Sequence, residues 1–532
     1  MSELLPTPEP VLAPEGSSAG PSARRGRAAR GGGGGRATVP EQRPFAQPRL
    51  RYAPTEVVSA DELESIHDAS LRILEQIGMD FLDEEARDLL AAAGASVLPG
   101  TQRVRFARDM VLEWVAKAPA SYTFHAVNPA QNLAIGGNMV AFGSVASAPN
   151  VVGLDGVRRI GNRADYQNLL RLAQSLNTVH FLGGYPVEPI DLHASIRHID
   201  ATFDSLTLCD KPIHCYSLGR QRNKDCLEMV RIARQVGEAT LEREPSIFTV
   251  INSSSPLRLD SPMLHGIMEF ASRNQIIVMT PFTLAGAMAP VSLAGALAQQ
   301  NAEALAGIAF AQIVRPGAPC MYGGFTSNVD MQSGAPAFGT PEYMRTAMIG
   351  GQLARRYNLP YRSSNVCAAN ALDAQAAYES VFSIWGALMG GVNFMMHGAG
   401  WMEGGLHASY AKMILDAELL QMVSSFLEPV IVDEDSLALD AIREVGPGGH
   451  FFGVGHTQDR FRTAFHHPML SDWRNYESWE EAGRPETAGK AAIVARQLLD
   501  AYVAPPMDAA VREELESFVA RRHEEGGVPT DY

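Results

Sequence analysis

The segment Val392-Asn-Phe-Met-Met-His-Gly-Ala-Gly-Trp-Met-Glu403 shows the unit from which the fold is built, because an apolar strand in it runs directly into a glycine-rich turn. The same order of apolar strand, turn and helix recurs from about residue 138 to about residue 426, and it is typical of parallel βα units. Eight units that close on themselves predict an α/β fold of the (β/α)8 TIM-barrel type, with an open doubly wound sheet as the alternative. The eight strand candidates lie near Val140, Val179, Ile213, Ile247, Ile276, Cys320, Tyr361 and Phe394.

Four regions follow one another along the chain. Residues 1–50 are rich in Pro, Gly, Ser and Arg and have almost no aromatic or branched side chains, so we expect a disordered tail. We expect an N-terminal helical region at 51–137, because Ser59-Ala-Asp-Glu62 forms a helix-capping box near its start. The TIM-barrel core is predicted at 138–426. Residues 427–532 contain an aromatic-rich stretch and two amphipathic helices, and we expect this C-terminal helical extension to pack on the barrel.

Charge, hydropathy and cysteine content limit the possible functions. The 532 residues carry a formal net charge of -15, which argues against a surface that binds nucleic acid. The sequence has no run of about 18 apolar residues, so we expect no membrane span. No apolar segment follows Arg24-Arg25, so we expect no export signal. Five cysteines without a CxxC pair indicate a reducing, cytoplasmic location.

The sequence shows no pattern for a resident cofactor. A catalytic zinc needs three closely placed His, Cys or carboxylate ligands, and His214-Cys215 is the one adjacent pair of His and Cys. Neighbouring residues of a strand point to opposite faces, so these two cannot line one site. No GxGxxG motif follows a predicted strand. We therefore expect neither a tightly bound metal nor a tightly bound nucleotide.

Aromatic side chains follow several predicted strands, at the end of the barrel where TIM-barrel active sites lie. Glycines beside them remove side chains and leave room for a wide mouth. Such a mouth suits a quaternary ammonium, which is best held by ring faces and a nearby carboxylate. The alternative is that several of the rings are ordinary core residues. We predict that the substrate is bound by Asn365 and by an aromatic cage, with cage candidates Tyr185, Tyr216, Tyr322, Phe325 and Trp401.

Three polar residues near the predicted strand ends are candidates for catalysis. His397 ends the strand Val392–Met396 and should point into the mouth, where it could hydrogen-bond the substrate or orient an acid. Glu403 lies six residues further on, and Asp330 follows the predicted sixth strand. The alternative is a buried structural histidine and two acids at helix caps or on the barrel rim.

Three blocks of this sequence resemble the trimethylamine methyltransferase family. They are Asn393-Phe-Met-Met-His-Gly-Ala-Gly-Trp-Met-Glu-Gly-Gly-Leu406, Tyr322-Gly-Gly-Phe-Thr-Ser-Asn-Val-Asp-Met331 and Gly449-His-Phe-Phe-Gly453, and the resemblance extends over about residues 55–525. It implies a TIM barrel that takes a methyl group from a methylated amine. The acceptor implied by the resemblance is the cobalt(I) of a corrinoid, which a separate corrinoid-binding protein carries.

The chain departs from the family pattern at one point. The archaeal trimethylamine enzymes of that family contain pyrrolysine, and this sequence has no such residue. Family members without pyrrolysine include enzymes for quaternary amines such as glycine betaine, whose methyl group can leave without a proton donor. We therefore expect methyl transfer from a methylated amine, either a quaternary amine such as a betaine or trimethylamine. The alternative is a barrel that binds a methylated amine without transferring its methyl group, and a homo-oligomer is left open.

Overall fold

A computed structural model describes residues 39–529, and its centre is an all-parallel sheet of seven strands. Neighbouring strands are in direct register, as Arg362 opposite Phe394 and Ile277 opposite Cys320 illustrate. The strands lie at seven of the eight predicted positions, in the order β6 (Ala141–Ser144), β18 (Phe394–Ala399), β17 (Tyr361–Ser364), β14 (Cys320–Gly323), β12 (Ile276–Met279), β10 (Ile247–Ile251) and β9 (Ile213–His214).

The predicted strand near Val179 is replaced by a short extended segment between the two edge strands. Gly143 and Phe181 form a parallel bridge, and the Ser144 amide donates to the Phe181 carbonyl at 3.1 Å. On the other side, the Leu182 amide donates to the carbonyl of Pro212, just before β9, at 2.9 Å. The segment therefore contacts both edges of the sheet.

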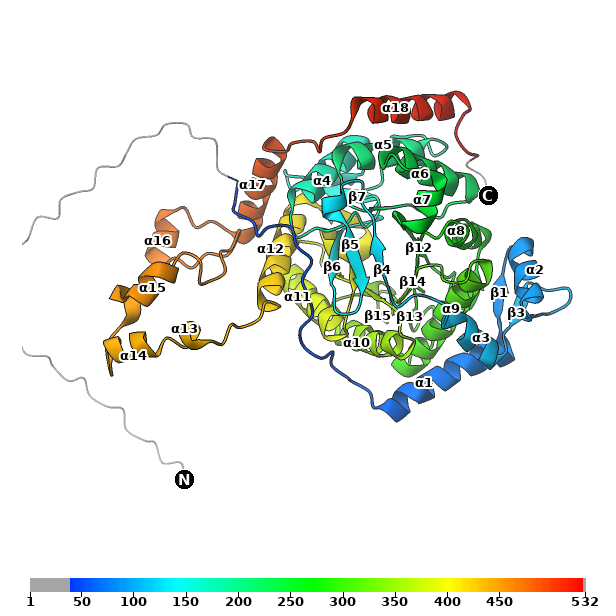
Figure 1. Ribbon diagram of the computed structural model, residues 1–532, viewed down its shortest axis with the longest axis horizontal. Coiled ribbons are helices and arrows are strands. Elements are labelled where there is room, and N and C mark those ends of the chain that lie inside the picture. The colour runs from blue at the N-terminus through cyan, green and yellow to red at the C-terminus, as the bar shows by residue number, and fades with distance from the viewer. Residues whose placement is uncertain (1–38, 530–532) are drawn as a thin grey trace, which may run out of the picture. The chain divides into compact units, whose positions relative to one another are not determined.

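Large apolar side chains fill the inside of the curved sheet. The rings of Phe181 and Phe394 stack with centroids 3.7 Å apart, and Phe248 packs edge-on against Phe181 at 5.7 Å. The hairpin of β4 (Ser121–Phe124) and β5 (Leu133–Gly136) lies against this cluster and contributes Phe124, Leu133 and Ile135 (Figure 1). These apolar contacts fill the inside of the sheet on the side away from the carboxyl ends of the strands.

Helices follow the strands and surround the sheet (Figure 1). Two of these helices are capped at their start, since the side chains of Asp260 and Thr340 accept hydrogen bonds from the amides of Met263 and Tyr343. No helix in residues 39–529 is long and apolar enough to cross a membrane. The surrounding helices are α4 (Arg163–Ser175), α5 (Arg197–Leu208), α6 (Arg220–Ala233), α7 (Glu238–Arg243), α8 (Ser261–Ser272), α9 (Leu293–Val314), α10 (Pro341–Arg356), α11 (Ala374–Met389) and α12 (Tyr410–Phe426).

Short strands form two further small sheets in the loops that follow the parallel strands. They extend the loops at the carboxyl end and give them defined positions. The first sheet contains β7 (Asn150–Val152), β8 (Arg158–Ile160), β19 (Trp401–Met402) and β20 (His407–Ser409), and the second contains β13 (Leu284–Ala285), β15 (Ser327–Val329) and β16 (Pro336–Ala337).

The N-terminal region contains strands as well as the expected helices. The capping box at Ser59 and Glu62 is present at the start of the first helix. Strands of two or three residues cannot be predicted from the sequence, because so short a segment shows little alternation. The helices are α1 (Ala60–Arg72), α2 (Glu84–Ala92) and α3 (Arg108–Val115), and the strands β1 (Met79–Phe81), β2 (Ser96–Val97) and β3 (Arg103–Arg105) form a sheet with β11 (Arg258–Leu259).

The segment expected to be a disordered tail lies partly outside the described residues, and residues 39–50 are placed on the body of the molecule. The Leu50 amide donates to the Asn138 carbonyl at 2.8 Å, and the Val140 amide donates to the Pro48 carbonyl at 3.0 Å. Backbone hydrogen bonds, which composition does not reveal, hold this segment next to β6.

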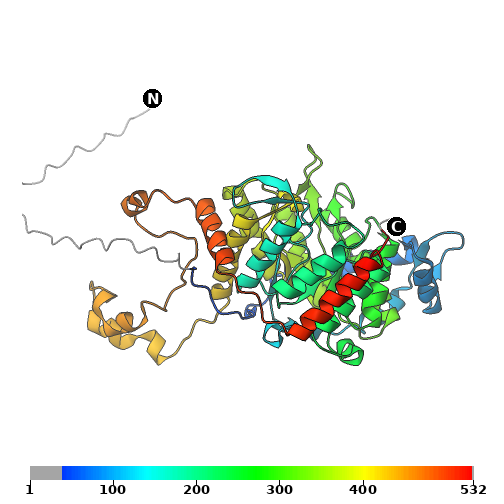
Figure 2. The same cartoon turned by 90° about the horizontal axis from the view of Figure 1, so that it is seen from above.

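Two of the C-terminal helices pack on the helices around the sheet. The helix α17 (Thr487–Asp500) packs on α12 and α4, and α18 (Ala509–Glu524) lies across α5 and α6 (Figures 1 and 2). Four short helices precede them: α13 (Glu434–Leu437), α14 (Leu439–Val445), α15 (Gly455–Arg460) and α16 (Tyr476–Glu481).

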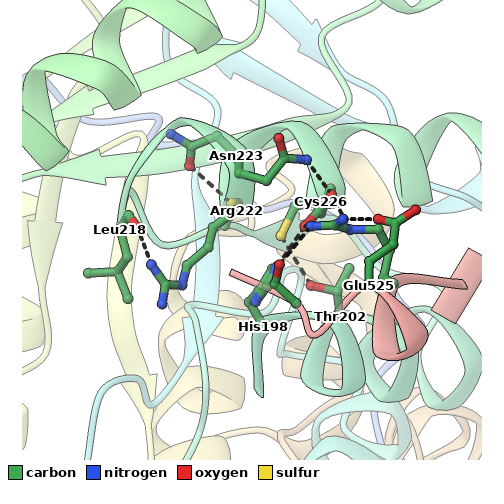
Figure 3. A network of polar contacts seen from close by, with 12 residues as sticks. His198, Thr202, Leu218, Arg222, Asn223, Cys226 and Glu525 are labelled. Atoms are coloured by element: carbon green, nitrogen blue, oxygen red, sulfur yellow. Dashed lines mark hydrogen bonds and ion pairs between the residues drawn. The ribbon is translucent and has the colours of Figure 1, made fainter. Parts of the chain in front are cut away.

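A buried polar network fastens α18 to the core (Figure 3). Asp225 on α6 accepts a hydrogen bond from His198 on α5 at 2.8 Å, and Arg522 of α18 contacts the same carboxylate at 3.1 Å. Burial opposes ionisation of Asp225, but the hydrogen bonds from His198 and Gln221 and the charge of Arg522 together lower its pKa. The carboxylate is therefore charged at neutral pH and holds three helices together.

We predict that Arg522→Ala lowers the free energy of unfolding by about 1–3 kcal/mol, because it removes one partner of a buried carboxylate. The matched control is Arg521→Ala, since the neighbouring Arg521 is 62% exposed and lies 4.0 Å from Glu525. An exposed pair of that kind contributes less than about 1 kcal/mol. Urea unfolding of both variants checks this, and equal losses would show that the network does not stabilise the fold.

Candidate active site

A cavity of about 270 Å³ lies at the carboxyl ends of the parallel strands. Its wall combines residues from the ends of β9, β10, β17 and β18 with residues from the loops that follow the other strands. Carboxyl ends of parallel strands meet at one edge of a sheet, which is why residues so distant in sequence converge here. The main lining side chains are Ser147, His214, Tyr216, Val250, Asn252, Met263, Thr280, Phe282, Phe325, Arg362, Met396, His397 and Trp401.

Aromatic rings form one side of the cavity. The ring centroids of Phe325 and Phe282 are 5.3 Å apart, and those of Phe325 and Trp401 are 6.0 Å apart. Tyr216 contributes a further ring, whose hydroxyl lies 2.7 Å from the Ser147 hydroxyl and accepts a hydrogen bond from the Tyr185 amide. Among the described residues, neither Asp nor Glu lines the cavity.

His397 lies in a distorted part of β18. Its φ is +55°, and the register between β18 and β6 shifts between Met395 and Ala399. Bulges of this kind re-aim a side chain, and left-handed non-glycine residues are often functional. The imidazole stacks on Trp401 at 5.3 Å, and its Nδ1 lies 3.1 Å from the Ser364 hydroxyl. Burial, reinforced by the charge of Arg362, lowers the pKa of His397 well below its usual value, so the ring is neutral at neutral pH.

Arg362 of β17 brings a buried positive charge into the cavity. Its Nη1 donates to the Gly324 carbonyl at 3.3 Å, and the guanidinium lies 5.3 Å from the centre of the Phe325 ring. The side chain is only 2% exposed, and burial lowers its pKa to about 10. No carboxylate within residues 39–529 forms an ion pair with it, and its Nε has no hydrogen-bond partner there. A buried charge without a counter-ion is costly, so the arrangement is suited to an anionic ligand group.

Two further polar groups of the cavity lack partners among the described residues. His214 accepts a hydrogen bond from the Val250 amide through Nε2 at 3.2 Å. Burial lowers the pKa of His214 to about 3, so its neutral ring carries the proton on Nδ1, which has no acceptor. The hydroxyl of Thr280 is also buried without a partner. With Arg362, these donors line the cavity and can bind an acceptor-rich group.

The structure brings four of the predicted site residues to the cavity wall, namely Tyr216, Phe325, His397 and Trp401. Glu403 lies at the rim, where it pairs with Arg158 at 2.9 Å and accepts a hydrogen bond from His407 at 2.8 Å. Asp330 accepts hydrogen bonds from Ser333 in an exposed turn. These contacts make Asp330 part of a turn outside the cavity.

Three other predicted residues lie behind the wall. The Tyr322 hydroxyl donates to Asn301 at 3.0 Å in the core, and the Tyr185 ring packs between Tyr166 and Tyr216. The amide of Asn365 donates to the Gly398 carbonyl at 3.1 Å, next to His397. Asn365 therefore supports the end of β18 itself, whereas Tyr322 and Tyr185 pack in the core.

Arg362, His214 and Thr280 are not among the site residues predicted from the sequence. A signal for Arg362 is present, since an arginine inside the buried strand Tyr361-Arg-Ser-Ser364 is unusual. For His214 and Thr280 the sequence shows no comparable signal. Within the described residues, no group of three or more His, Cys, Asp or Glu side chains is placed to hold a metal ion.

A fully buried ion pair holds the loop between β18 and β19. Lys412 contacts both carboxylate oxygens of Asp416, at 2.6 and 2.7 Å, and both side chains are inaccessible to solvent. Asp416 also accepts a hydrogen bond from the Gly400 amide at 2.8 Å. Because Gly400 precedes Trp401, this pair fixes the ring that stacks on His397.

Comparison with known proteins identifies the family. A family model for trimethylamine methyltransferases matches residues 23–527. The chain belongs to the trimethylamine methyltransferase family. This confirms the resemblance inferred from the three sequence blocks.

The relatives of this methyltransferase are named after different methylated amines. It is 36% identical to the glycine betaine methyltransferase of Desulfitobacterium hafniense (strain Y51), over 88% of this chain and 98% of that protein. A trimethylamine methyltransferase of strain DCB-2 is 27% identical over 88% of this chain and 94% of that protein. The crystal structure of the monomethylamine methyltransferase of Methanosarcina barkeri superposes with a TM-score of 0.50 at 10% identity, covering 88% and 89% of the two chains. This last similarity concerns the fold alone.

We predict that Lys412→Met lowers the free energy of unfolding by about 3–5 kcal/mol, because Asp416 is left as a buried charge without a partner. The double variant Lys412→Met/Asp416→Leu should recover most of that loss of stability. We expect it to transfer methyl groups more slowly than the natural chain, because the Gly400 amide loses its hydrogen bond to Asp416. Lys224→Met is the control, since Lys224 is 44% exposed and lies 3.9 Å from Glu269. If Lys412→Met and Lys224→Met unfold at the same urea concentration, the buried pair has no structural role.

We also predict that stability falls between pH 7.5 and pH 5.5. Burial lowers the pKa of His67 to about 4 and those of His180 and His214 to about 3, so these rings stay neutral in the folded chain. In the unfolded chain they bind protons below about pH 6.5, which favours unfolding as the pH falls. The expected loss is about 1 kcal/mol per histidine at pH 5.5. Urea unfolding at both pH values measures it, and an unchanged pH dependence in His180→Gln would contradict this explanation.

Proposed function

We propose that this chain transfers a methyl group from a betaine, a quaternary amine that also carries a carboxylate, to a corrinoid on a partner protein. The observation that supports the proposal is the buried guanidinium of Arg362, which faces aromatic rings in a cavity that no acidic side chain of residues 39–529 lines. The rings suit the quaternary ammonium, and the guanidinium suits the carboxylate. The name of the relative in Desulfitobacterium hafniense, a glycine betaine methyltransferase, supports the same substrate class.

The positive charge of Arg362 in the cavity should favour the binding of a betaine over that of a substrate that is only a cation. Arg362 repels a substrate with a net positive charge, and the described cavity has no carboxylate to offset that repulsion. A betaine has no net charge, and its carboxylate can accept hydrogen bonds from Arg362, His214 and Thr280. We therefore expect choline and the trimethylammonium ion to bind more weakly than a betaine.

The protonation state of His397 in the cavity is compatible with a quaternary amine as the methyl donor. When a methyl group leaves a quaternary nitrogen, the C–N bond breaks and its electron pair stays on nitrogen, so the product is a neutral tertiary amine. This step needs no proton donor, and the neutral ring of His397 supplies none. We assign His397 to positioning, together with Trp401, because misplacing the reacting methyl group is expensive.

The corrinoid, which the partner protein carries, supplies the nucleophile that accepts the methyl group. Exposed apolar side chains on the loops at the carboxyl end fit a docking surface for such a partner. They belong to the β7–β8 hairpin and to the loops near β13, β15 and β20. Between 51% and 73% of each side chain is exposed in Val157, Ile160, Val291, Met331 and Leu406. Exposed apolar groups around a cavity commonly mark a protein contact.

We further infer that the parallel sheet closes into a (β/α)8 barrel. The support for this is the segment Val179–Leu182, whose hydrogen bonds reach β6 on one side and the residue before β9 on the other. A closed barrel leaves no open edge and concentrates all loops around one mouth. The regions before and after it then support the barrel from outside.

We predict that Arg362→Met weakens the use of glycine betaine by about tenfold to a hundredfold in kcat/KM, because a charge-assisted contact is worth about 1.5–3 kcal/mol. Choline, which lacks the carboxylate, should lose little, so the preference for betaine over choline should collapse. The measurement is formation of the demethylated amine with free cob(I)alamin as acceptor. Glycine betaine, choline and trimethylamine are compared as methyl donors.

Arg355→Met is the control, since Arg355 lies outside the cavity and donates to the Gly390 carbonyl. It should leave the preference for betaine unchanged. If the natural chain demethylates choline as well as glycine betaine, the carboxylate has no role. If it binds betaines but demethylates none of them, the chain is a binding protein.

A further inference from the structure

Two apolar surfaces of the described chain stay exposed to solvent. The first, which we name the arm, is the segment 428–486 with α13 to α16. The second, which we name the α11–α12 face, is the outer side of these two helices, with Tyr378, Val381, Phe382, Met422 and Phe426. Neither surface belongs to the cavity described above.

The arm has almost no core of its own. Its buried apolar side chains are Ala441, Val454 and Leu470. Three such side chains are too few to offset the entropy lost when a segment of this length becomes ordered. Its exposed apolar side chains include Val430, Ile431, Val432, Leu437, Leu439, Ile442, Phe451, Phe452, Phe461, Phe465, Trp473 and Tyr476.

The arm contacts the rest of the described chain at few points. Arg43 pairs with Glu428 at its start, and the amides of Met469 and Ser471 donate to Glu418 at 2.8 and 3.4 Å. Figures 1 and 2 both draw α13 to α16 outside the ring of helices that surrounds the sheet. Intramolecular packing therefore leaves the aromatic side chains of the arm uncovered.

The α11–α12 face carries no exposed charge. The charged side chains of these two helices are Glu379, Lys412, Asp416 and Glu418, and all four are buried. On the outer side, the ring of Phe426 lies 5.1 Å from that of Trp385 and 5.4 Å from that of Tyr52. A helix that faces water normally presents charged or polar residues there, so this face is suited to contact with another protein.

We propose that the arm of one copy of this chain packs on the α11–α12 face of a second copy, and that the second copy returns the same contact. Both surfaces belong to one chain, so the partner is present at equal concentration. The exposed side chains of the arm can bury on the order of 1,000 Å² per copy, which is what a stable dimer needs. A two-fold axis then gives two identical contacts and leaves neither surface open.

The position of the two surfaces favours a second copy over the corrinoid protein as the occupant. The helix α12 follows β18 and runs back, so Phe426 at its end lies near the amino end of the sheet, beside Tyr52. The cavity opens at the other end. A dimer formed through the arm therefore leaves the cavity accessible to the partner that carries the corrinoid.

We predict that the full chain is at least a dimer at micromolar concentration in sedimentation-velocity experiments. Phe452→Asp/Trp473→Asp in the arm and Val381→Asp/Phe382→Asp on the face should each shift it to the monomer. The control is Val503→Asp, because Val503 is 81% exposed and lies between α17 and α18, outside both surfaces. Circular dichroism confirms that each variant is folded.

Mixing the two double variants gives the sharper test. One arm and one face remain intact in that mixture, so one contact can form and a heterodimer should reappear. A monomeric natural chain would overturn the proposal. So would an assembly that dissociates in the arm variant but persists in the face variant, since the arm would then contact something other than the face. A heterodimer that fails to form from two folded variants would also count against it.

Discussion

Parallel pairing of seven strands is the constraint on which the other features depend. It sends every strand in the same direction, so each connection has to return on the outside as a helix, and every strand ends at the same edge. The amino end is closed by the β4–β5 hairpin and its apolar side chains. The carboxyl end is left to loops, where His214, Thr280, Phe325 and His397 meet although they are far apart in sequence.

At the carboxyl end, the fold buries a positive charge that no acidic side chain of the described residues neutralises. Arg362 is buried beside Phe325 with one carbonyl as its hydrogen-bond acceptor and no carboxylate among the described residues. A guanidinium in such a place destabilises the empty cavity, and the same property favours a ligand with a negative group. Burial lowers the pKa of both His214 and His397 and keeps their rings neutral, and for His397 the charge of Arg362 adds to this effect. The proposed preference for a betaine and the protonation states in this cavity thus have a common physical origin.

Support from behind the cavity is as specific as the cavity wall. The Lys412–Asp416 pair holds the Gly400 amide, and Asn365 holds the Gly398 carbonyl, so the two ends of a glycine-rich turn are fixed. That turn carries the stack of His397 on Trp401. Glycine allows the backbone of this turn to adopt its unusual conformation. The buried ion pair then restricts the motion of the turn, so that His397 and Trp401 keep the positions that methyl transfer requires.

Local patterns in the sequence predicted the alternation of strands and helices, the family, and the presence of aromatic residues and His397 at the strand ends. These depend on local periodicity and on motifs, which neighbouring residues define. The folded chain was needed to show that Phe325 and Trp401 line the cavity while Tyr322 bonds to Asn301 in the core. The same holds for Arg362, because a partner that is missing can be recognised only when all its neighbours in space are known. Burial and hydrogen bonding are set by residues far apart along the chain, and a local pattern does not contain that information.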